Sequence, residues 1–310
     1  MSLVLFDAPG PRARRRANIG SAIAIAVFAA LVAWAIWRLN DRAQFESGLW
    51  DPFTDRGIQK AIARGFGATI RAALFAVLLA LLLGLLLAAG RLSARRWLRW
   101  PCVAFVEFFR ATPVVILILF LFIAFSDDFE PIGDDLSDAL PHRIASIVGA
   151  DQIGTLAPLV IALMLYNGAV LAEVFRAGIL AVPKGQREAA LAVGLTQRQT
   201  MRQILMPQAT RIMLPAIVSQ AVVALKDTSL GFIIAYPELV RVGRNIYDTR
   251  FNILPTVFVV TVIYVALNMS LDAFARWLER RQSRRYGRAA AATAVLPAGT
   301  MADGSGGAGV

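Results

Sequence analysis

The sequence predicts an all-α integral membrane protein with six transmembrane helices and both termini in the cytoplasm. Of the 310 residues, 57% are hydrophobic and 17% are charged, and the mean hydropathy is +0.61. A soluble domain has about 45–50% apolar and about 25% charged residues. Six apolar stretches approach or reach the length of about 20 residues that a helix needs to cross a bilayer. The Arg residues cluster between these stretches, as is typical of membrane proteins.

The predicted spans are the six apolar stretches. They cover residues 19–37, 68–89, 102–126, 156–175, 212–235 and 254–274. The first follows several arginines, as a secretory signal does, but its apolar core is longer than the roughly 7–15 residues of a cleaved signal. We therefore interpret it as an uncleaved helix.

The basic residues predict the orientation. Cytoplasmic segments of membrane proteins carry an excess of Lys and Arg. With the N-terminus inside, most of the 32 Lys and Arg residues fall on the cytoplasmic side. The connection between the third and fourth spans is then external, and it is acidic. Its acidic residues are Asp127, Asp128, Glu130, Asp134, Asp135 and Asp138.

The sequence also excludes several kinds of chemistry. With one cysteine, Cys102, and one histidine, His142, an intrachain disulfide, a Cys/His zinc site and a His-based triad all lack partners. No G-x-x-x-x-G-K-[ST] motif occurs, so this chain does not cradle nucleotide phosphates through a P-loop. The net charge of +11 comes from basic residues that flank apolar spans, whereas nucleic-acid binding needs a basic face on a soluble fold. We expect no nucleic-acid partner, no metal and no cofactor in this chain.

The predicted organisation has a core flanked by tails. Residues 1–18 form a basic cytoplasmic tail, 19–37 an additional N-terminal helix, 38–64 an external segment, 65–276 a core of five spans, and 277–310 a second cytoplasmic tail. From about residue 289 the sequence is mostly Ala, Gly, Ser and Thr, a composition that favours disorder.

The cytoplasmic loop of the core, at about 176–211, is the most informative segment. Pro183 suits the first turn of a helix, where its missing N–H has no partner in any case. Gly194 fits the left-handed position that ends a helix. Thr196 and Gln199 have capping-box spacing for a second helix. A short helix exposed on a loop has the right shape to dock into the groove of a partner protein.

Several motifs resemble one family. Glu188-Ala189-Ala190, followed by Gly194 and Pro207, resembles the EAA loop of the permease subunits of ABC importers. Four further segments resemble the branch that takes up polar amino acids, and their amino-acid sequences are similar to those of glutamate-type permeases. They are FVEFFRATP (105–113), YNGAVLAEVFRAGI (166–179), VPKGQREAA (182–190) and LKDTSL (225–230).

The chain departs from the family pattern at three positions. Met206 stands where leucine usually precedes the proline, which is a conservative change. Ala111 replaces a glycine, and Leu117 replaces a glutamine, which puts any substrate role of that glutamine in doubt.

The resemblance implies a function and a set of partners. It implies a multi-pass permease of the bacterial inner membrane that imports polar amino acids, with glutamate as the favoured substrate on the sequences of the motifs. A cytoplasmic ABC ATPase dimer would use the ATP and bind the EAA loop. A second, homologous permease and an extracytoplasmic solute-binding protein would complete the transporter, which lipid surrounds. The residues implied for the ATPase-coupling loop are Pro183, Lys184, Gly185, Glu188, Ala189, Ala190, Gly194 and Pro207.

Polar residues within the spans are candidates for the substrate pathway, because such groups are costly in lipid and usually face a bundle interior or a cavity. Three clusters lie near the middle of the spans: Arg110 with Thr112, Asn167, and Lys226 with Asp227, Thr228 and Ser229. For Thr112 and Asn167, hydrogen bonds between helices are favoured over a role in the pathway. For Lys226 to Ser229, a role in the pathway and a role in packing are about equally supported.

Two pairs lie closer to the cytoplasmic face. Glu107 with Arg110, and Glu173 with Arg176, have the spacing of ion pairs on one helix. A zwitterionic amino acid needs both a cation and an anion, so Arg110 and Glu173 are also pathway candidates.

The alternative function is a secondary amino-acid carrier driven by an ion gradient, in which Lys226 and Asp227 couple the ion to transport. This alternative leaves the EAA loop unexplained. A membrane-anchored enzyme lacks both a soluble domain and a nucleophile constellation.

Overall fold

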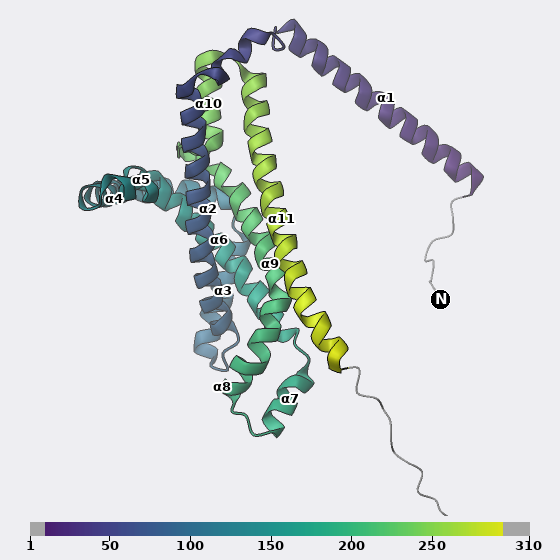
Figure 1. The fold of residues 1–310 in the computed structure, drawn as a ribbon, viewed down its shortest axis with the longest axis vertical. Helices are drawn as coiled ribbons and strands as arrows, with labels where there is room; N and C mark the ends of the chain where they lie inside the picture. The colour runs from purple at the N-terminus through teal and green to yellow at the C-terminus, as the bar shows by residue number, and fades with distance from the viewer. Residues whose placement is uncertain (1–9, 294–310) are drawn as a thin grey trace, which may run out of the picture. The chain divides into compact units, whose positions relative to one another are not determined.

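The computed structural model describes the backbone of residues 10–293 and the side chains of residues 10–274, 276 and 277. Within this part every regular element is a helix. Five helical segments are long and apolar enough to cross a membrane, and a sixth crossing results if a bent pair of helices counts as one span. The prediction of an all-α membrane protein is therefore confirmed (Figure 1).

The elements follow one another with short connections. The α-helices are α1 Pro11–Asp41, α2 Arg56–Arg91, α3 Arg96–Ala111, α4 Val114–Ala139, α5 His142–Val148, α6 Ile153–Leu180, α7 Lys184–Ala192, α8 Gln197–Gln199, α9 Met206–Asp227, α10 Leu239–Arg250 and α11 Ile253–Thr293. The short 3₁₀ helices are η1 Ser47–Leu49, η2 Asp51–Thr54, η3 Ala150–Gln152 and η5 Thr228–Ile234, and η4 Thr200–Leu205 is a π-helix.

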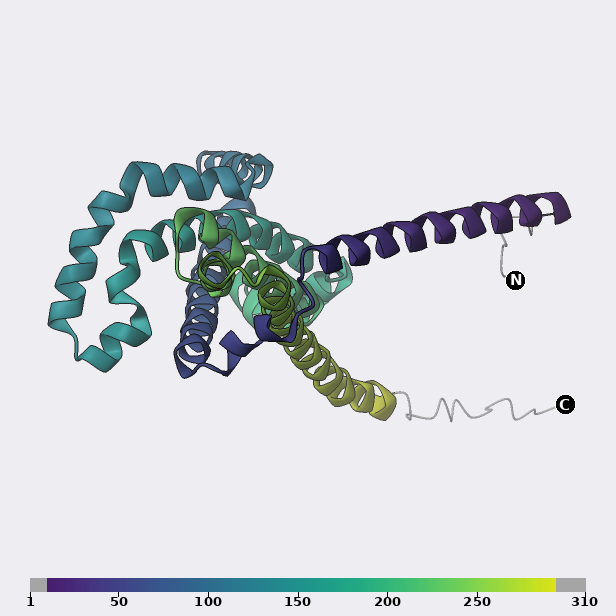
Figure 2. The ribbon, with the colours of Figure 1, turned by 90° about the horizontal axis from the view of Figure 1, so that it is seen from above.

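The third predicted span, 102–126, is wrong as a single straight helix. It is divided between α3 and α4, which meet at a bend of 101°. Proline has no backbone N–H and disfavours helical geometry at the residue before it. Thr112 and Pro113 are accordingly extended, with ψ of 128° and 125°. As a result α4 leaves α3 sideways (Figures 1 and 2).

Three further boundaries differ from the prediction. The fifth span, 212–235, changes at Asp227 from α-helix to the 3₁₀ helix η5. The N-terminal tail is helical from Pro11, so its arginines extend α1. The predicted disordered tail begins too early, because α11 continues to Thr293, and the rest of that prediction, 294–310, lies outside the described residues.

The described residues form two compact units. Unit 1 contains residues 10–61 and 243–259, and unit 2 contains 62–242 and 260–293. In unit 1 the fully buried Asn252 donates its side-chain N–H to the Leu49 carbonyl at 3.1 Å. Trp50 packs edge-on against Phe258, with ring centroids 5.7 Å apart. These contacts join the η1–η2 segment to the start of α11.

The core of unit 2 is built around α6. This helix packs against α3, α4 and α9, and its side chains include the fully buried Leu159 and Leu163. Small residues permit close approach, as is usual between membrane helices. A Cβ atom at Gly84 would lie 3.0 Å from the Gly168 carbonyl oxygen, so α2 and α6 touch backbone to backbone there.

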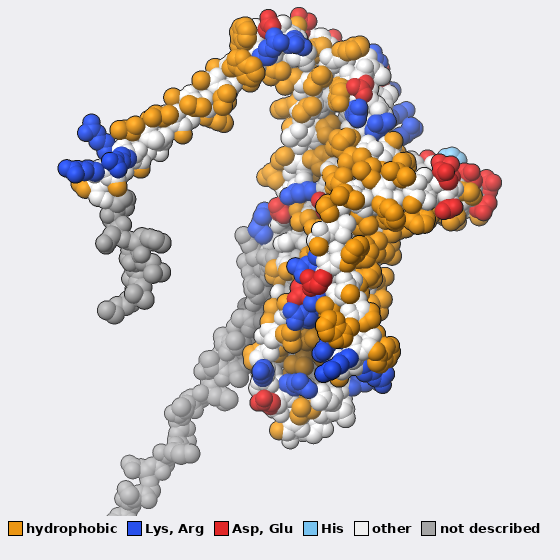
Figure 3. All heavy atoms as spheres, turned by 180° about the vertical axis from the view of Figure 1, so that it is seen from behind, with side chains coloured by type: hydrophobic (Ala, Val, Ile, Leu, Met, Phe, Trp, Pro, Cys, Tyr) orange, Lys and Arg blue, Asp and Glu red, His pale blue; other side chains and the backbone are white. Residues whose placement is uncertain are grey.

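Helix α1 has no buried residue in this chain. Its exposed side chains include Ile25, Phe28 and Leu31, each more than half exposed. Orange hydrophobic side chains cover it in Figure 3, and blue basic side chains lie at both ends. An all-round apolar helix of this kind requires lipid or another protein around it.

The acidic connection predicted to be external forms the end of α4 and precedes α5. Figure 3 shows these acidic side chains gathered beside the histidine. The face of the membrane to which they belong is a prediction.

In a chain with Cys102→Ser, we expect a cysteine at the exposed position of Asp134 (Asp134→Cys) to react with a membrane-impermeant maleimide in intact cells. Arg198→Cys, at an exposed position of α8, should react only after permeabilisation. Labelling of Asp134→Cys only after permeabilisation would contradict the orientation.

Candidate functional site

The loop between α6 and α9 has the helix–turn–helix form that its sequence predicts. Helix α7 begins at Lys184, and Pro183 is its N-cap (φ −55°, ψ 134°), one residue before the predicted first-turn position. Both α7 and α8 project from one end of unit 2 (Figure 1).

Gly194 ends α7 in the predicted left-handed conformation, with φ of +86°. Its N–H donates to the Leu191 carbonyl at 3.0 Å, and the Leu195 N–H donates to the Ala190 carbonyl at 3.1 Å. These two bonds are those of a Schellman motif, which satisfies the last carbonyls of a helix. No neighbouring atom lies within 4 Å of a Cβ added at Gly194, so only the backbone conformation calls for glycine.

The capping box that begins α8 is also confirmed. The Gln199 N–H donates to the Thr196 hydroxyl at 3.3 Å, and the Thr196 N–H donates to the Gln199 side-chain oxygen at 2.9 Å. The π-helix η4 follows and leads into Pro207 near the start of α9. Pro207 has no N–H to give to a preceding carbonyl, and its ring clashes with a regular α-helical turn. A widened turn at this point relieves that clash.

Helix α7 divides its residues between an anchored side and a free side. Ala190 is buried, whereas Glu188 and Ala189 are exposed. Val193 is 78% exposed and Leu191 is 37% exposed, so apolar side chains lie free next to Gly194. Lys184 and Gly185 are also exposed. This side offers both polar and apolar groups to a partner.

The anchored side leads into the core of unit 2. Val182, just before α7, packs in one buried cluster with Leu205 of η4, Met213 of α9 and Phe175 of α6. Gly178 lies directly against Met213, because a Cβ there would be 2.0 Å from the Met213 side chain. The loop is therefore joined tightly to both helices that carry it.

A network of charges connects three helices near this end of unit 2. Arg91 of α2, with its side chain 10% exposed, lies 3.4 Å from Glu107 of α3 and 3.2 Å from Glu173 of α6. Glu173 also pairs with Arg176, as predicted. The predicted pair of Glu107 with Arg110 is wrong, because Glu107 turns toward Arg91 on the neighbouring helix. Spacing within one helix could not reveal this competing partner.

Asn167 and Thr112 have structural hydrogen bonds. Asn167 is buried, donates to the Leu163 carbonyl at 2.9 Å and accepts from Gln220 of α9 at 2.6 Å. Thr112 donates its hydroxyl to the Phe108 carbonyl at 2.9 Å, within the end of α3. Arg110 is exposed. The bond across α6 and α9 gives Asn167 a role in packing.

Lys226 to Ser229 lie where α9 ends and η5 begins. Thr228 and Ser229 donate their hydroxyls to the Leu225 and Lys226 carbonyls at 2.6 and 2.7 Å. These bonds hold both hydroxyls against the backbone at the change of helix type. Within residues 10–277, neither Lys226 nor Asp227 has a side-chain hydrogen bond or an ion pair. No such bond joins this cluster to Arg110 or Asn167 either.

Sequence reasoning missed a polar network around Arg71 of α2. Its guanidinium donates to the Ser146 carbonyl at 3.0 Å, to the Tyr236 hydroxyl at 3.2 Å and to Gln152. Tyr236 donates in turn to the Ala68 carbonyl at 3.0 Å. The network joins α2 to the α5–η3 segment and to the end of η5. A single arginine near a span end gave no sequence signal for partners 75 to 165 positions away.

A second network missed by sequence reasoning surrounds Glu238, which is fully buried before α10. Its carboxylate accepts the N–H groups of Val240 and Arg241 at 2.8 and 2.6 Å and the Tyr264 hydroxyl at 2.9 Å. Burial raises the pKa of the Glu238 carboxyl, while these hydrogen bonds act in the opposite direction. Burial also raises the pKa of the Tyr236 hydroxyl, against the effect of Arg71. Glu238 thus caps α10 and ties it to α11.

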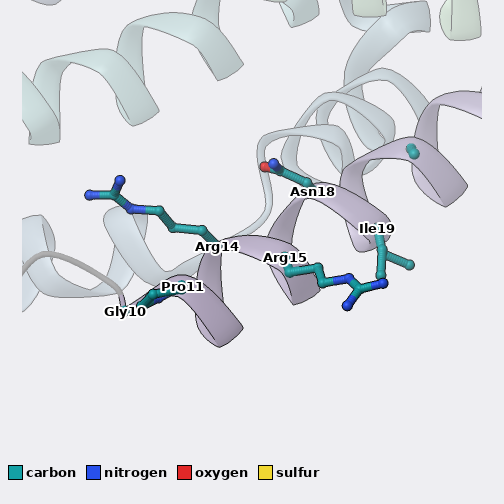
Figure 4. Close-up of a pocket in the computed structure, with 7 residues that line it drawn as sticks. Gly10, Pro11, Arg14, Arg15, Asn18 and Ile19 are labelled. Carbon is teal, nitrogen blue, oxygen red and sulfur yellow. The ribbon is translucent and has the colours of Figure 1, made fainter.

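The first turns of α1 show a shallow hollow bordered by Arg14, Arg15 and Asn18 (Figure 4). Arg14 and Arg15 extend away from one another, so they do not converge on a ligand. All of its lining residues belong to this single helix or its N-cap, and we assign no site there.

Comparison with known proteins identifies the family. A family described as "Binding-protein-dependent transport system inner membrane component" matches residues 80–284. The chain belongs to this family. It is 41% identical over 252 residues to the glutamate transport system permease protein GluD of Corynebacterium glutamicum, covering 81% of this chain and 85% of that protein. It is 34% identical over 179 residues to the glutamine transport system permease protein GlnP of Escherichia coli K12, covering 58% of this chain and 73% of that protein.

Solved structures of transporters have the same fold. A crystal structure of an amino acid ABC transporter with histidines matches with a TM-score of 0.59 and 25% identity, over 72% of this chain and 94% of that one. An inward-facing MetNI methionine ABC transporter matches with a TM-score of 0.55 and 21% identity, over 73% and 98%. This family member is therefore a multi-pass transport subunit of the inner membrane.

The Arg91 network yields a test. Arg91→Gln removes the cation that lies between Glu107 and Glu173. We expect a loss of about 1–2 kcal/mol of stability, less than for a fully buried pair, because the Glu107 side chain is 58% exposed and Glu173 keeps Arg176. The measurement is thermal unfolding of the full-length protein in detergent.

A matched control is Arg244→Gln, which breaks an exposed pair with Asp248 at 3.6 Å. Exposed pairs contribute about 0–1 kcal/mol, so its effect should be small. Equal effects of Arg91→Gln and Arg244→Gln would show that the network is not a stabilising contact.

Proposed function

We propose that the chain is the permease subunit of an ATP-driven importer of polar amino acids, with glutamate as its substrate. The observation that carries this proposal is the exposed α7, closed by Gly194 and anchored in the core. The names of the relatives, glutamate and glutamine transport permeases, support the class of substrate. The motif at 182–190, which resembles that branch, supports it independently.

We propose that the partners are those of a complete importer. The exposed side of α7, with Glu188 and Ala189, docks on a cytoplasmic ABC ATPase dimer, which hydrolyses the ATP. A second, homologous permease packs beside this chain, and an extracytoplasmic solute-binding protein delivers the amino acid. The exposed apolar residues Leu191 and Val193 support docking, because a partner that covers them removes apolar surface from water.

The proposed mechanism transmits movement from the loop to the spans. When the ATPases close, α7 moves with them. Because Val182, Leu205 and Met213 pack in one cluster, the ends of α6 and α9 follow as a unit. The interior of a protein is close-packed and deforms little, so the displacement reaches the spans as rocking and alternates access. No covalent bond changes in this chain.

Candidates for substrate contact remain part of the proposal. Arg110 and Lys226 are exposed and unpaired within the described residues, so either is free to meet a carboxylate. Glu173 is neutralised by Arg91 and Arg176, which makes it a poorer partner for an ammonium group. Asp227, with no ion-pair partner, is the better candidate for that role. Thr228 and Ser229 shape the helix end that presents these groups.

The coupling role of the loop gives the main prediction. Gly194→Val forces a β-branched residue into a left-handed conformation, at a cost of about 1–2 kcal/mol, and re-aims α8 relative to α7. We expect normal membrane abundance, with reduced ATPase co-purification and reduced uptake. Gly194→Asn should keep most of both, because asparagine adopts this conformation more readily.

Gly67→Val is a matched control in α2. Gly67 has no positive φ and no atom within 4 Å of an added Cβ. The Gly67→Val variant should leave ATPase association and uptake intact. If Gly194→Val also leaves both intact at matched abundance, the loop is only a connector.

The substrate prediction concerns reconstituted uptake. With the ATPase, the second permease and the solute-binding protein in proteoliposomes, we expect ATP-dependent accumulation of glutamate, with competition by other polar amino acids and none by sugars. Accumulation without the ATPase, driven by an ion gradient, would instead support a secondary carrier. Transport of a sugar or a metal ion in place of amino acids would refute the substrate class.

A further inference from the structure

Unit 1 contains a hollow of about 700 Å³ between two segments far apart in the sequence. One wall is the end of α1, with Arg38, Leu39 and Arg42. The other is the end of α10 and the start of α11, with Tyr247, Phe251 and Ile253. The Gln44 side chain, which also lines the hollow, accepts the Leu254 N–H at 3.5 Å and links the two walls.

Both walls lie at the boundary of the membrane. The apolar stretch of α1 ends at Trp37, and Arg38 follows directly. The membrane span of α11 begins at Ile253. Trp34 and Trp37 are 62% and 61% exposed on α1, and tryptophan is enriched where a span meets lipid headgroups. The hollow is thus at headgroup depth, whichever side of the membrane it faces.

The hollow has one positive charge without a partner. Arg38 pairs with Asp41 at 2.8 Å, and Asp248, which also lines the hollow, pairs with Arg244 at 3.6 Å. The Arg42 side chain has no ion pair or hydrogen bond within the described residues. The Tyr247 hydroxyl, half-buried in the opposite wall, is likewise free as a donor.

The apolar edge of the hollow is held in an unusual conformation. Phe251 has φ of +56° and is 79% exposed. Left-handed backbone is unfavourable for a residue with a bulky side chain and persists only where neighbours enforce it. The next residue, Asn252, is fully buried and bonded to the Leu49 carbonyl, which fixes the backbone here. Ile253 beside it is 54% exposed, so two apolar side chains border the charged hollow.

We propose that this hollow binds the phosphodiester headgroup of an anionic membrane phospholipid. Arg42 pairs with the phosphate and the Tyr247 hydroxyl donates to it, while Phe251 and Ile253 contact the glycerol and the first acyl carbons. One unpaired arginine matches the single negative charge of such a headgroup. The ammonium of a zwitterionic lipid would be repelled by Arg42, whose charge has no partner in the hollow. Basic pockets at span ends bind headgroups in this manner.

The test measures lipid retention by the purified full-length chain. Native mass spectrometry of protein incubated with phosphatidylglycerol or with phosphatidylcholine reports bound lipid. We expect preferential retention of phosphatidylglycerol and about fivefold weaker retention by Arg42→Gln, the effect of one basic residue near the surface. Tyr247→Phe should weaken retention to a smaller extent. Arg56→Gln, an exposed basic residue of unit 1 outside the hollow, should retain phosphatidylglycerol as the wild type does.

A second arm distinguishes the source of the phosphate. Inorganic phosphate added in millimolar excess should not displace phosphatidylglycerol, because it lacks the apolar part that Phe251 and Ile253 contact; displacement would assign the hollow to free phosphate. Equal retention of the two lipids, or equal losses in Arg42→Gln and Arg56→Gln, would overturn the proposal. Unchanged lipid retention in Arg42→Gln with weakened binding of the solute-binding protein would assign the hollow to protein docking.

Discussion

The structure depends on one constraint: in hydrocarbon, backbone polar groups must find their hydrogen bonds within the protein. Long helices meet it without help, and every interruption needs a local remedy. At the bend between α3 and α4, the Phe108 carbonyl accepts both the N–H and the hydroxyl of Thr112. At the end of α9, the hydroxyls of Thr228 and Ser229 bond the Leu225 and Lys226 carbonyls. Polar side chains at these interruptions therefore bond the backbone of their own helix end.

Charged groups obey the same constraint by gathering between helices. Arg91 joins two carboxylates from α3 and α6, and Arg71 is held by a carbonyl, an amide and a hydroxyl from distant segments. Arg71 and Arg91 lie near the two ends of the predicted span 68–89 within α2, so polar interactions brace both ends of that span, while small residues such as Gly84 pack between them.

Sequence reasoning succeeded where structure is local. The spans follow from runs of apolar residues, and the Gly194 turn and the Thr196 capping box follow from interactions between near neighbours. It failed where the deciding partner is remote in sequence. Glu107 pairs with Arg91 of α2, and not with Arg110 of its own helix α3. The break at Pro113 had a local signal, but the 101° bend depends on how α4 packs against α6, which no short-range pattern encodes.

The Gly194 turn is closed by bonds between residues no more than five positions apart. The bonds that close the turn therefore involve no residue of a distant segment, although Val182 and Ala190 anchor the helix in the core. A segment whose shape is encoded locally keeps that shape when the spans around it change in sequence, so related permeases can differ in their spans and still present the same turn.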